Sequence, residues 1–362
     1  MTLSPLTTAR TYGCSTVPVI PKHGYQSPSR IETYLKCGRR YFFTHVLGFK
    51  SETPNIHFAS GGALAVYQQT LREAGTWDAA AHTTAIKALD EGYRRRYPIS
   101  SWSSMRTTET NKSLGRVIKI ANEYFEKYAE RDSQYTTIAI ERPFTVLIDD
   151  DASQYNGMSP ILAGIVDWIY EHNGLVTARD DKSTGGKYGY YRTTYLDSWN
   201  RSFQIDSYIH ALYMLSEVLG FDRVDIAGAE VAVVMMHSDR TYTRKDGSVT
   251  RTEGKNEILP PLPVRKTPRQ MLAYLGRAKR TYWNLAVDFE LLAGHSPSDD
   301  SLDCFPGNSP FCQKNGCDFP ELCPLSNPLE RVEQWMEQPP AGFKIDHGSP
   351  LLVKEDEEQK ND

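Results

Sequence analysis

Four charged residues near the middle of the chain stand at spacings that suit metal chemistry. Asp167 precedes the dipeptide Asn173-Gly174, and Asp180 and Lys182 follow it. Asn-Gly is a strong signal for a two-residue hairpin loop, because a type I′ turn needs positive φ at both central residues. A loop of that length places Asp167 directly opposite Asp180 on the neighbouring strand, and Asp181 completes the acidic group.

Two carboxylates opposed across a β-ladder repel each other, and a divalent cation would remove the repulsion. Mg²⁺ or Mn²⁺ takes oxygen ligands and keeps several waters, which leaves a position for a phosphate oxygen. Lys182 shares the strand face of Asp180, where an ammonium group can orient or deprotonate an attacking water and stabilise charge in the transition state. The expected chemistry is phosphodiester hydrolysis. A surface hairpin with solvated charges is the alternative, and these residues alone leave both interpretations open.

The flanking sequence predicts the elements that position this hairpin. A capping box at 29–32 opens a helix whose apolar positions run to Leu47, and Thr267-Pro268 opens a last long helix. A turn at 245–248 predicts another hairpin. We expect further helices over 61–74, within 79–128 and over 203–219, and strands over 136–148, 161–170, 175–181 and 229–237. This order predicts an α/β fold with a helical insertion.

Three segments around and after the hairpin resemble the Asp, (D/E)XK and QxxxY motifs of RecB-like nucleases in the PD-(D/E)XK superfamily. In chain order they are Gly164-Ile165-Val166-Asp167, Asp180-Asp181-Lys182-Ser183-Thr184 and Gln204-Ile205-Asp206-Ser207-Tyr208. The resemblance implies a restriction-endonuclease-like core, in which a small mixed sheet is flanked by helices, with a helical insertion and a C-terminal cysteine-rich segment.

The resemblance also implies roles for single residues. Asp167 and Asp180 would bind the metal together with the backbone carbonyl of Asp181, and Lys182 would be the catalytic lysine. Two further residues, four apart and therefore on one helical face, would lie near the DNA and the active site: Gln204 and Tyr208.

One position departs from the family pattern. Many RecB-like nucleases carry a metal-binding histidine on an early helix, and the matching stretch here, 58–65, ends in Ala65. Gln68, Gln69 or Glu141 could supply an oxygen ligand instead. The missing histidine also raises an alternative function, that of a catalytically inactive iron-sulfur or zinc DNA-binding scaffold in a recombination complex.

Three cysteines lie within twelve residues of a Pro-, Gly- and Asn-rich segment that cannot build its own apolar core: Cys312, Cys317 and Cys323. They leave a tetrahedral metal or a cubane cluster one ligand short, and Cys37 is the natural fourth. The contexts at 34–37 and 305–308 resemble those of RecB-like nucleases with iron-sulfur domains, which implies a structural [4Fe-4S] cluster on these four cysteines. Zinc is the alternative, Cys304 is a competing ligand, and Cys14 is expected to be a free thiol.

Basic residues interleaved with aromatic ones suit single-stranded DNA, because phosphates contact cations and bases stack on rings. The expected DNA contacts are Arg39, Arg40, Lys187, Tyr191 and Arg192. The last three belong to a run that we expect to be a loop. The formal net charge is −4, and the tail at 354–362 carries five acidic and two basic residues. A DNA-binding surface must therefore be a local patch.

The 362-residue chain has no stretch of about 20 apolar residues and no signal-peptide pattern, which predicts a cytoplasmic protein of a bacterial, archaeal or phage-infected cell. We expect a loosely ordered N-terminus at 1–26, N-terminal helices with the first cluster cysteine at 27–74, a helical insertion at 75–132, a nuclease core at 133–300, a cysteine segment at 301–326 and a C-terminal extension with an acidic tail at 327–362.

The sequence thus predicts a deoxyribonuclease, an exonuclease rather than an endonuclease, that uses Mg²⁺ or Mn²⁺ and acts on single-stranded DNA or DNA with free ends. It would serve recombination, repair, or phage or CRISPR DNA processing. The stretch 185–187 lacks the spacing of a P-loop, so unwinding would come from a helicase or another recombination protein.

Overall fold

The structure is a computed structural model of the 362-residue chain. It describes residues 25–98, 112–155, 158, 160–185, 190–237, 239–244, 246–252, 254–295, 298–308, 317–324 and 327–347. In this part of the chain, no helix combines the length and the apolar character needed to cross a bilayer.

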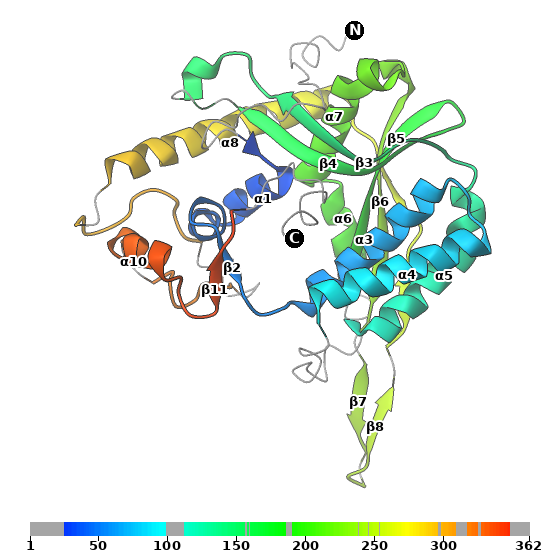
Figure 1. The fold of residues 1–362 in the computed structure, drawn as a ribbon. Helices are drawn as coiled ribbons and strands as arrows, with labels where there is room; N and C mark the ends of the chain where they lie inside the picture. The colour runs from blue at the N-terminus through cyan, green and yellow to red at the C-terminus, as the bar shows by residue number, and fades with distance from the viewer. Residues whose placement is uncertain are drawn as a thin grey trace, which may run out of the picture.

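A seven-stranded mixed sheet forms the centre of the fold (Figure 1). Its strands are β1 (Tyr25–Gln26), β3 (Thr136–Leu147), β4 (Ile161–His172), β5 (Leu175–Thr184), β6 (Ile226–Met236), β9 (Asn256–Ile258) and β10 (Leu262–Val264). The strands β3, β4 and β5 are antiparallel neighbours, whereas β5 and β6 run parallel. Parallel pairing aligns the C-terminal ends of β5 and β6 at one edge of the sheet.

Helices pack on both faces of this sheet (Figure 1). One face carries α3 (Ile56–Ala74), α4 (Ala79–Arg96) and α5 (Leu114–Asp132), which share an apolar cluster with β6. The other face carries α1 (Pro28–Lys36), α7 (Phe203–Leu219) and α8 (Pro268–Gly294), which belong to the larger core. This arrangement is the expected small mixed sheet flanked by helices.

Local signals set both ends of α7 and the start of α8. The Ser202 side chain accepts a hydrogen bond from the N–H of Gln204, and Gly220 ends α7 with a φ of 77°. Helix α8 begins at Pro268 with Thr267 as N-cap and Gln270 completing a capping box. Both starts were predicted from the sequence and are confirmed.

The first helix differs from the prediction at both ends. Its N-cap is Ser27 rather than Ser29, since the Ser27 side chain accepts from the N–H of Arg30 and Pro28 occupies the first helical position. The helix ends at Cys37, whose backbone is extended, instead of continuing to Leu47. The chain then forms the short helix α2 (Gly38–Tyr41) and a π-helical turn at Phe42–Val46.

Two other segments are more regular than expected. The residues of β1 are buried and pair with β4, although we placed them in a loosely ordered lead-in. Helix α6 (Tyr190–Trp199) includes residues that we expected to lie in a loop. The expected turn at 245–248 connects β7 (Arg240–Thr243) and β8 (Val249–Thr252), which project from the body as an arm (Figure 1); Lys245 itself lies outside the described residues.

The C-terminal part packs back on the N-terminal part. Strand β11 (Phe343–Ile345) pairs antiparallel with β2 (Phe49–Ser51), after the 3-10 turn Pro328–Arg331 and the short helix α10 (Val332–Glu337). Shorter 3-10 turns lie at Ala152–Tyr155 and Arg223–Asp225. The aromatic rings of Phe43, Phe49 and Trp335 contact one another at this junction.

Candidate functional site

The strands β4 and β5 separate at the two predicted metal-binding aspartates. Their paired residues run from His172↔Leu175 to Trp168↔Arg179, in the register that we predicted, and Asp167 and Asp180 are the next positions. On the far side of these aspartates, the edge of β4 that had paired with β5 pairs with β1 instead. The other edge of β4 is occupied by β3. The site therefore lies in a gap of the ladder between β1 and β5. The turn residue Asn173 has the positive φ of 52° that the predicted hairpin needs.

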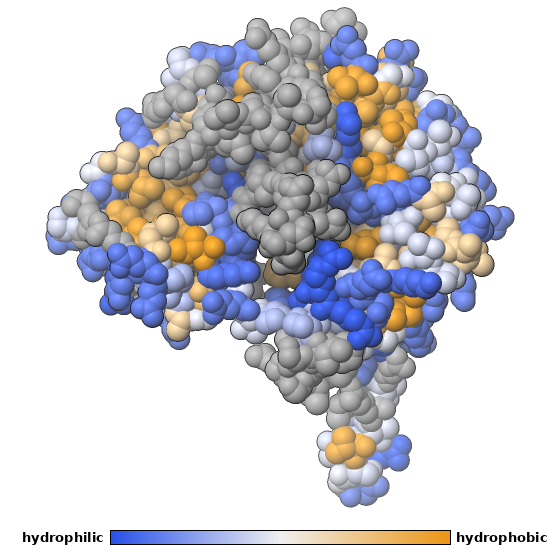
Figure 2. Space-filling view, in the orientation of Figure 1, coloured by the Kyte–Doolittle hydropathy of each residue, from blue (hydrophilic) through white to orange (hydrophobic). Residues whose placement is uncertain are grey.

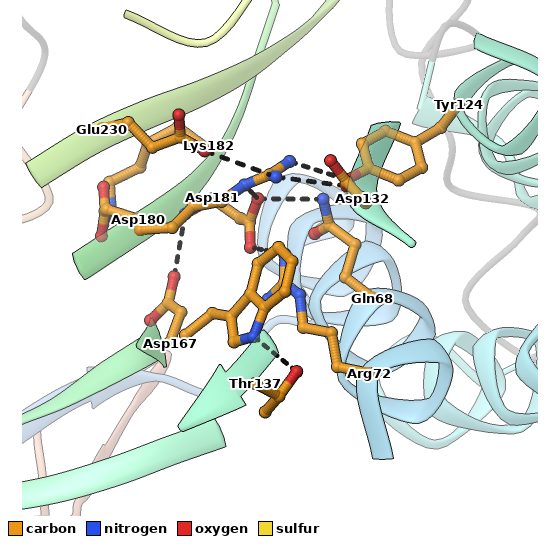
Figure 3. A network of polar contacts seen from close by, with 12 residues as sticks. Gln68, Arg72, Tyr124, Asp132, Thr137, Asp167, Asp180, Asp181, Lys182 and Glu230 are labelled. Carbon is orange, nitrogen blue, oxygen red and sulfur yellow. Dashed lines mark hydrogen bonds and ion pairs between the residues drawn. The ribbon is translucent and has the colours of Figure 1, made fainter. Parts of the chain in front are cut away.

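The gap brings together the five side chains that the motifs predicted. Asp180 is fully buried, and its Oδ1 accepts hydrogen bonds from Lys182 Nζ (2.8 Å) and Gln204 Nε2 (3.2 Å). Gln204 also donates to the Tyr208 hydroxyl at 2.8 Å. Asp167 Oδ2 accepts from the backbone N–H of Asp181 at 2.9 Å (Figure 3).

One oxygen of this group has no partner within the described residues. Asp180 Oδ2 is buried and accepts no hydrogen bond. A buried carboxylate oxygen without a hydrogen-bond donor destabilises the folded state by about as much as the loss of a hydrogen bond to a charged group. A metal ion coordinated by this oxygen would remove that cost, so the donor set fits a hard divalent cation.

The charges in the gap are mutually dependent. Burial raises the pKa of Asp180 to about 7 and also raises the pKa of Asp167, and repulsion between the carboxylates adds to both shifts. Burial would lower the pKa of Lys182, but the two aspartates outweigh it and raise that pKa above its ordinary value. Two carboxylates beside one ammonium leave excess negative charge for a cation to balance.

The neighbouring Asp181 faces the opposite side of the sheet, where a buried ionic network holds it (Figure 3). Its carboxylate accepts from Arg72, from Arg179 Nε at 3.1 Å and from Gln68 Nε2 at 3.1 Å. Burial would raise the pKa of Asp181, but the two guanidinium groups hold it below its ordinary value. The network fixes the backbone of Asp181, whose N–H binds Asp167.

Helix α5 supplies the other side of this network. Arg179 is fully buried and donates to Asp132 Oδ2 at 3.2 Å and to the Tyr124 hydroxyl at 2.7 Å. Arg72 lies over the Trp168 ring, 4.5 Å from its centroid. Sequence reasoning missed these residues, because charged residues that alternate along a strand ordinarily indicate a solvated face.

Comparison with known proteins agrees with this geometry. Residues 25–324 match the PD-(D/E)XK nuclease superfamily. The chain belongs to the PD-(D/E)XK nuclease superfamily. No curated protein matches the chain at a significant level.

The stretch that we compared with the metal-binding histidine of RecB-like nucleases lies on α3. Ala65 is half-buried there. Of the residues that we considered as substitutes, Gln68 is bonded to Asp181 and Gln69 to the exposed Glu73, so neither points at the gap. Glu141 does lie beside it: the pairs on either side of Glu141 place it opposite Asp167, with a φ of 45° that is unusual for a residue with a side chain.

The cysteine segment of this superfamily member packs beside Cys37. Asn308 Nδ2 donates to the carbonyl of Lys36 at 2.7 Å, and Arg40 pairs with Asp318 at 3.0 Å. Cys37 is buried, Cys317 and Cys323 are half-buried, and Cys312 lies outside the described residues. Among the residues that the structure describes, no three histidine, cysteine or acidic side chains are gathered closely enough to hold a metal ion. Burial raises the pKa of the Cys304 thiol to about 11.

The residues that we expected to contact DNA differ in how exposed they are. Arg39 is 9% exposed and donates to the carbonyl of Leu302, so little of its side chain is accessible in this structure. Arg40 is more accessible but is paired with Asp318. Lys187 and the side chains of Tyr191 and Arg192 lie outside the described residues.

Proposed function

We propose that this chain is a divalent-metal-dependent DNA nuclease whose centre is the gap between β1 and β5. The observation that carries the proposal is the buried Asp180 Oδ2, which has no partner among the described residues while Oδ1 is held by Lys182 and Gln204. Membership of the nuclease superfamily supports the same reaction class.

Asp167 and Asp180 would hold the metal, with the backbone carbonyl of Asp181 as a third ligand. Among the described residues no third acidic side chain stands close enough to complete this group; Glu141, opposite Asp167 on β3, would have to turn toward the ion to act as a further carboxylate. Mg²⁺ and Mn²⁺ suit this set, since they accept a few carboxylates and retain waters. Such an ion supplies charge neutralisation for a phosphate and a water of lowered pKa.

Lys182 would act on the phosphate and on the attacking water. Its ammonium is anchored to Asp180 Oδ1 at 2.8 Å, so its charge is positioned before substrate arrives. Gln204 is a positioning residue, because it donates to both Asp180 and the Tyr208 hydroxyl and so joins α7 to the metal-binding strand.

We further propose that the chain is a RecB-like exonuclease of recombination, repair, or phage or CRISPR DNA processing, with a helicase or recombination protein as partner. The order of its motifs supports this assignment. A [4Fe-4S] cluster on Cys37, Cys312, Cys317 and Cys323, with zinc as the alternative metal, would join the two ends of the described fold. The contacts of Asn308 and Asp318 with the segment around Cys37 support that arrangement.

Degradation of end-labelled single- and double-stranded DNA with Mn²⁺ tests the nuclease proposal. We expect the wild type to cut DNA. Lys182→Ala and Asp180→Asn should each lower the cleavage rate by at least about 100-fold, as the loss of one transition-state contact does. Asp150→Asn, at an exposed carboxylate, is the matched control and should cut normally. Equal rates for the wild type and Asp180→Asn would refute the proposed centre. DNA binding without cutting by any protein would favour the scaffold function.

Elemental analysis of anaerobically purified protein tests the cluster. We expect iron and acid-labile sulfide in the wild type and their loss in Cys312→Ser, with Cys14→Ser unchanged. Zinc without sulfide would identify a zinc site instead, and neither metal would refute the assignment.

A further inference from the structure

The ammonium of the proposed catalytic lysine has an aromatic partner besides the carboxylate. Lys182 Nζ donates to Asp180 Oδ1 at 2.8 Å and lies over the Trp199 ring, 5.4 Å from its centroid. A cation within about 6 Å of a ring centroid is attracted to the ring face, and tryptophan attracts it most strongly. Side chains of two elements, β5 and α6, therefore hold the same ammonium group.

Helix α6 carries this ring together with a second one. Trp199 is the last residue of α6, and Tyr195 lies one turn earlier on the same face. The two rings meet edge to face, with centroids 5.7 Å apart and planes at 85°. Both are half-buried and pack against the larger core. Burial raises the pKa of Tyr195 and the charge of Lys182 opposes that rise, so the ammonium acts on both side chains.

The segment that follows Trp199 is fixed by three hydrogen bonds. The Trp199 carbonyl accepts from the N–H of Ser202 at 3.2 Å. Lys266 Nζ donates to the Asn200 carbonyl at 2.6 Å. Glu32, on α1, accepts from the Ser202 hydroxyl at 3.0 Å. The indole is therefore held in place before any substrate arrives, as electrostatic preorganisation requires.

The ring adds to the attractions that act on the lysine. The charges of Asp180 and Asp167 both attract the Lys182 ammonium. A lysine carries its charge on a flexible stem, so this attraction alone leaves the ammonium several positions. Gln204, five residues after Trp199, already donates to the same Asp180 Oδ1 at 3.2 Å. One short segment thus contacts both partners of the Lys182–Asp180 pair and narrows the positions that they can take.

We propose that Trp199 is a positioning residue, whose indole face holds the Lys182 ammonium at Asp180 in the orientation that the phosphate requires. The inference rests on the proposed function, because Trp199 would act on the reaction only through Lys182. Removing the ring should therefore slow the chemical step. The affinity for metal should change little, because the carboxylates stay in place.

Fluorinated tryptophans inserted at position 199 test this role. Each fluorine withdraws electron density from the ring face and changes the shape of the ring little, so it weakens the attraction for a cation. We expect the logarithm of the single-turnover cleavage rate with Mn²⁺ to fall with each added fluorine. The same series at Trp283, a ring that is 53% exposed on α8, is the matched control and should leave the rate unchanged. A rate that is independent of fluorine content at position 199 would overturn the proposal, since a ring that only packs against the core would give that result.

Substitutions separate the ring face from its volume. Trp199→Phe keeps an aromatic face and should retain most of the rate, whereas Trp199→Leu should lower it about 5- to 30-fold. In a Lys182→Ala background, Trp199→Leu should change the residual rate by less than about twofold, because no ammonium is left to position. An equal fold loss in both backgrounds would contradict the proposal. Tyr242→Leu removes an exposed ring from the β7–β8 arm, which projects from the body (Figure 2), and should cut at the wild-type rate.

Urea unfolding distinguishes failure of this inference from failure of the nuclease proposal. Trp199→Leu, Lys182→Ala and the double variant form a cycle that measures the coupling of the two side chains without any cleavage. Coupled effects in a protein that cuts no DNA would support the contact and count against the nuclease proposal alone. Additive effects would overturn the contact, whether or not the wild type cuts.

Discussion

Removing the Arg179 side chain should strongly destabilise the fold. This guanidinium is fully buried and pairs with Asp132 at 3.2 Å and with Asp181 at 3.1 Å. Breaking a buried ion pair by removing one partner costs about 3–5 kcal/mol, because the remaining charge is left without compensation. Asp181 keeps Arg72 and Asp132 keeps Arg131, so we expect Arg179→Met to lose about 3 kcal/mol, at the low end of that range.

Urea unfolding of the metal-free protein measures this loss as a shift of the midpoint at an unchanged slope. Arg94→Met is the matched control, because Arg94 pairs with Asp90 on an exposed helix surface. That pair is screened by solvent, so Arg94→Met should leave the midpoint close to that of the wild type. The double variant Arg179→Met, Asp132→Leu should regain part of the stability, since it also removes a buried carboxylate that has lost one of its two guanidinium partners. A loss below about 1 kcal/mol in Arg179→Met would refute the structural role that we assign to this network.

Two further outcomes follow from particular positions. Burial lowers the pKa of His210 from 6.5 to about 4, so the folded protein resists protonation of this side chain. The free energy of unfolding should therefore fall by up to about 3 kcal/mol as the pH falls from about 6.5 to about 4. Urea unfolding at each pH measures this change, which should be smaller in His210→Phe. Gly228→Ala should lower the free energy of unfolding by at least about 2 kcal/mol, because the φ of Gly228 is 127° and the new Cβ would lie 2.4 Å from the carbonyl oxygen of Val264. Gly115→Ala is the control: space around Gly115 is open, so this variant should be as stable as the wild type or more stable. Equal midpoints for the two alanine variants would contradict the second expectation.

The sequence predicted the hairpin and its register because the signal there is local. Asn173-Gly174 determines a two-residue turn, and the turn determines which strand positions face each other. The start of α8 was predicted for the same reason, since a cap and a proline act within one helical turn. The bounds of α7 were predicted from the periodicity of its apolar residues.

The end of the first helix could not be predicted in this way. The break at Cys37 coincides with a tertiary contact, in which a Cβ atom at Gly38 would lie 2.9 Å from the backbone of Phe305 and the N–H of Arg39 donates to the carbonyl of Pro306. Residues more than 260 positions apart determine that geometry, and no periodicity in the local sequence reports it.

Burial of charge was the second feature that the sequence concealed. Arg179 and Asp181 alternate with Asp180 on one strand, a pattern that ordinarily indicates one solvated face. Their partners Arg72 and Asp132 come from α3 and α5, two helices that precede β3, β4 and β5 in the chain. Only the packing of α3 and α5 on β5 shows that both faces of this strand are buried. Asp180 on one face belongs to the proposed metal site, whereas Arg179 and Asp181 on the other face belong to the ionic network.

The affinity of the metal-free protein for Mn²⁺, measured by isothermal titration calorimetry, tests the central claim most directly. We expect one site in the wild type and a loss of at least about tenfold in Asp180→Asn, since the amide nitrogen or a neutral oxygen replaces the anionic ligand that the buried Asp180 Oδ2 provides. Asp150→Asn should bind as the wild type does. Equal Mn²⁺ affinity in the wild type and Asp180→Asn would contradict the placement of the metal in the gap between β1 and β5.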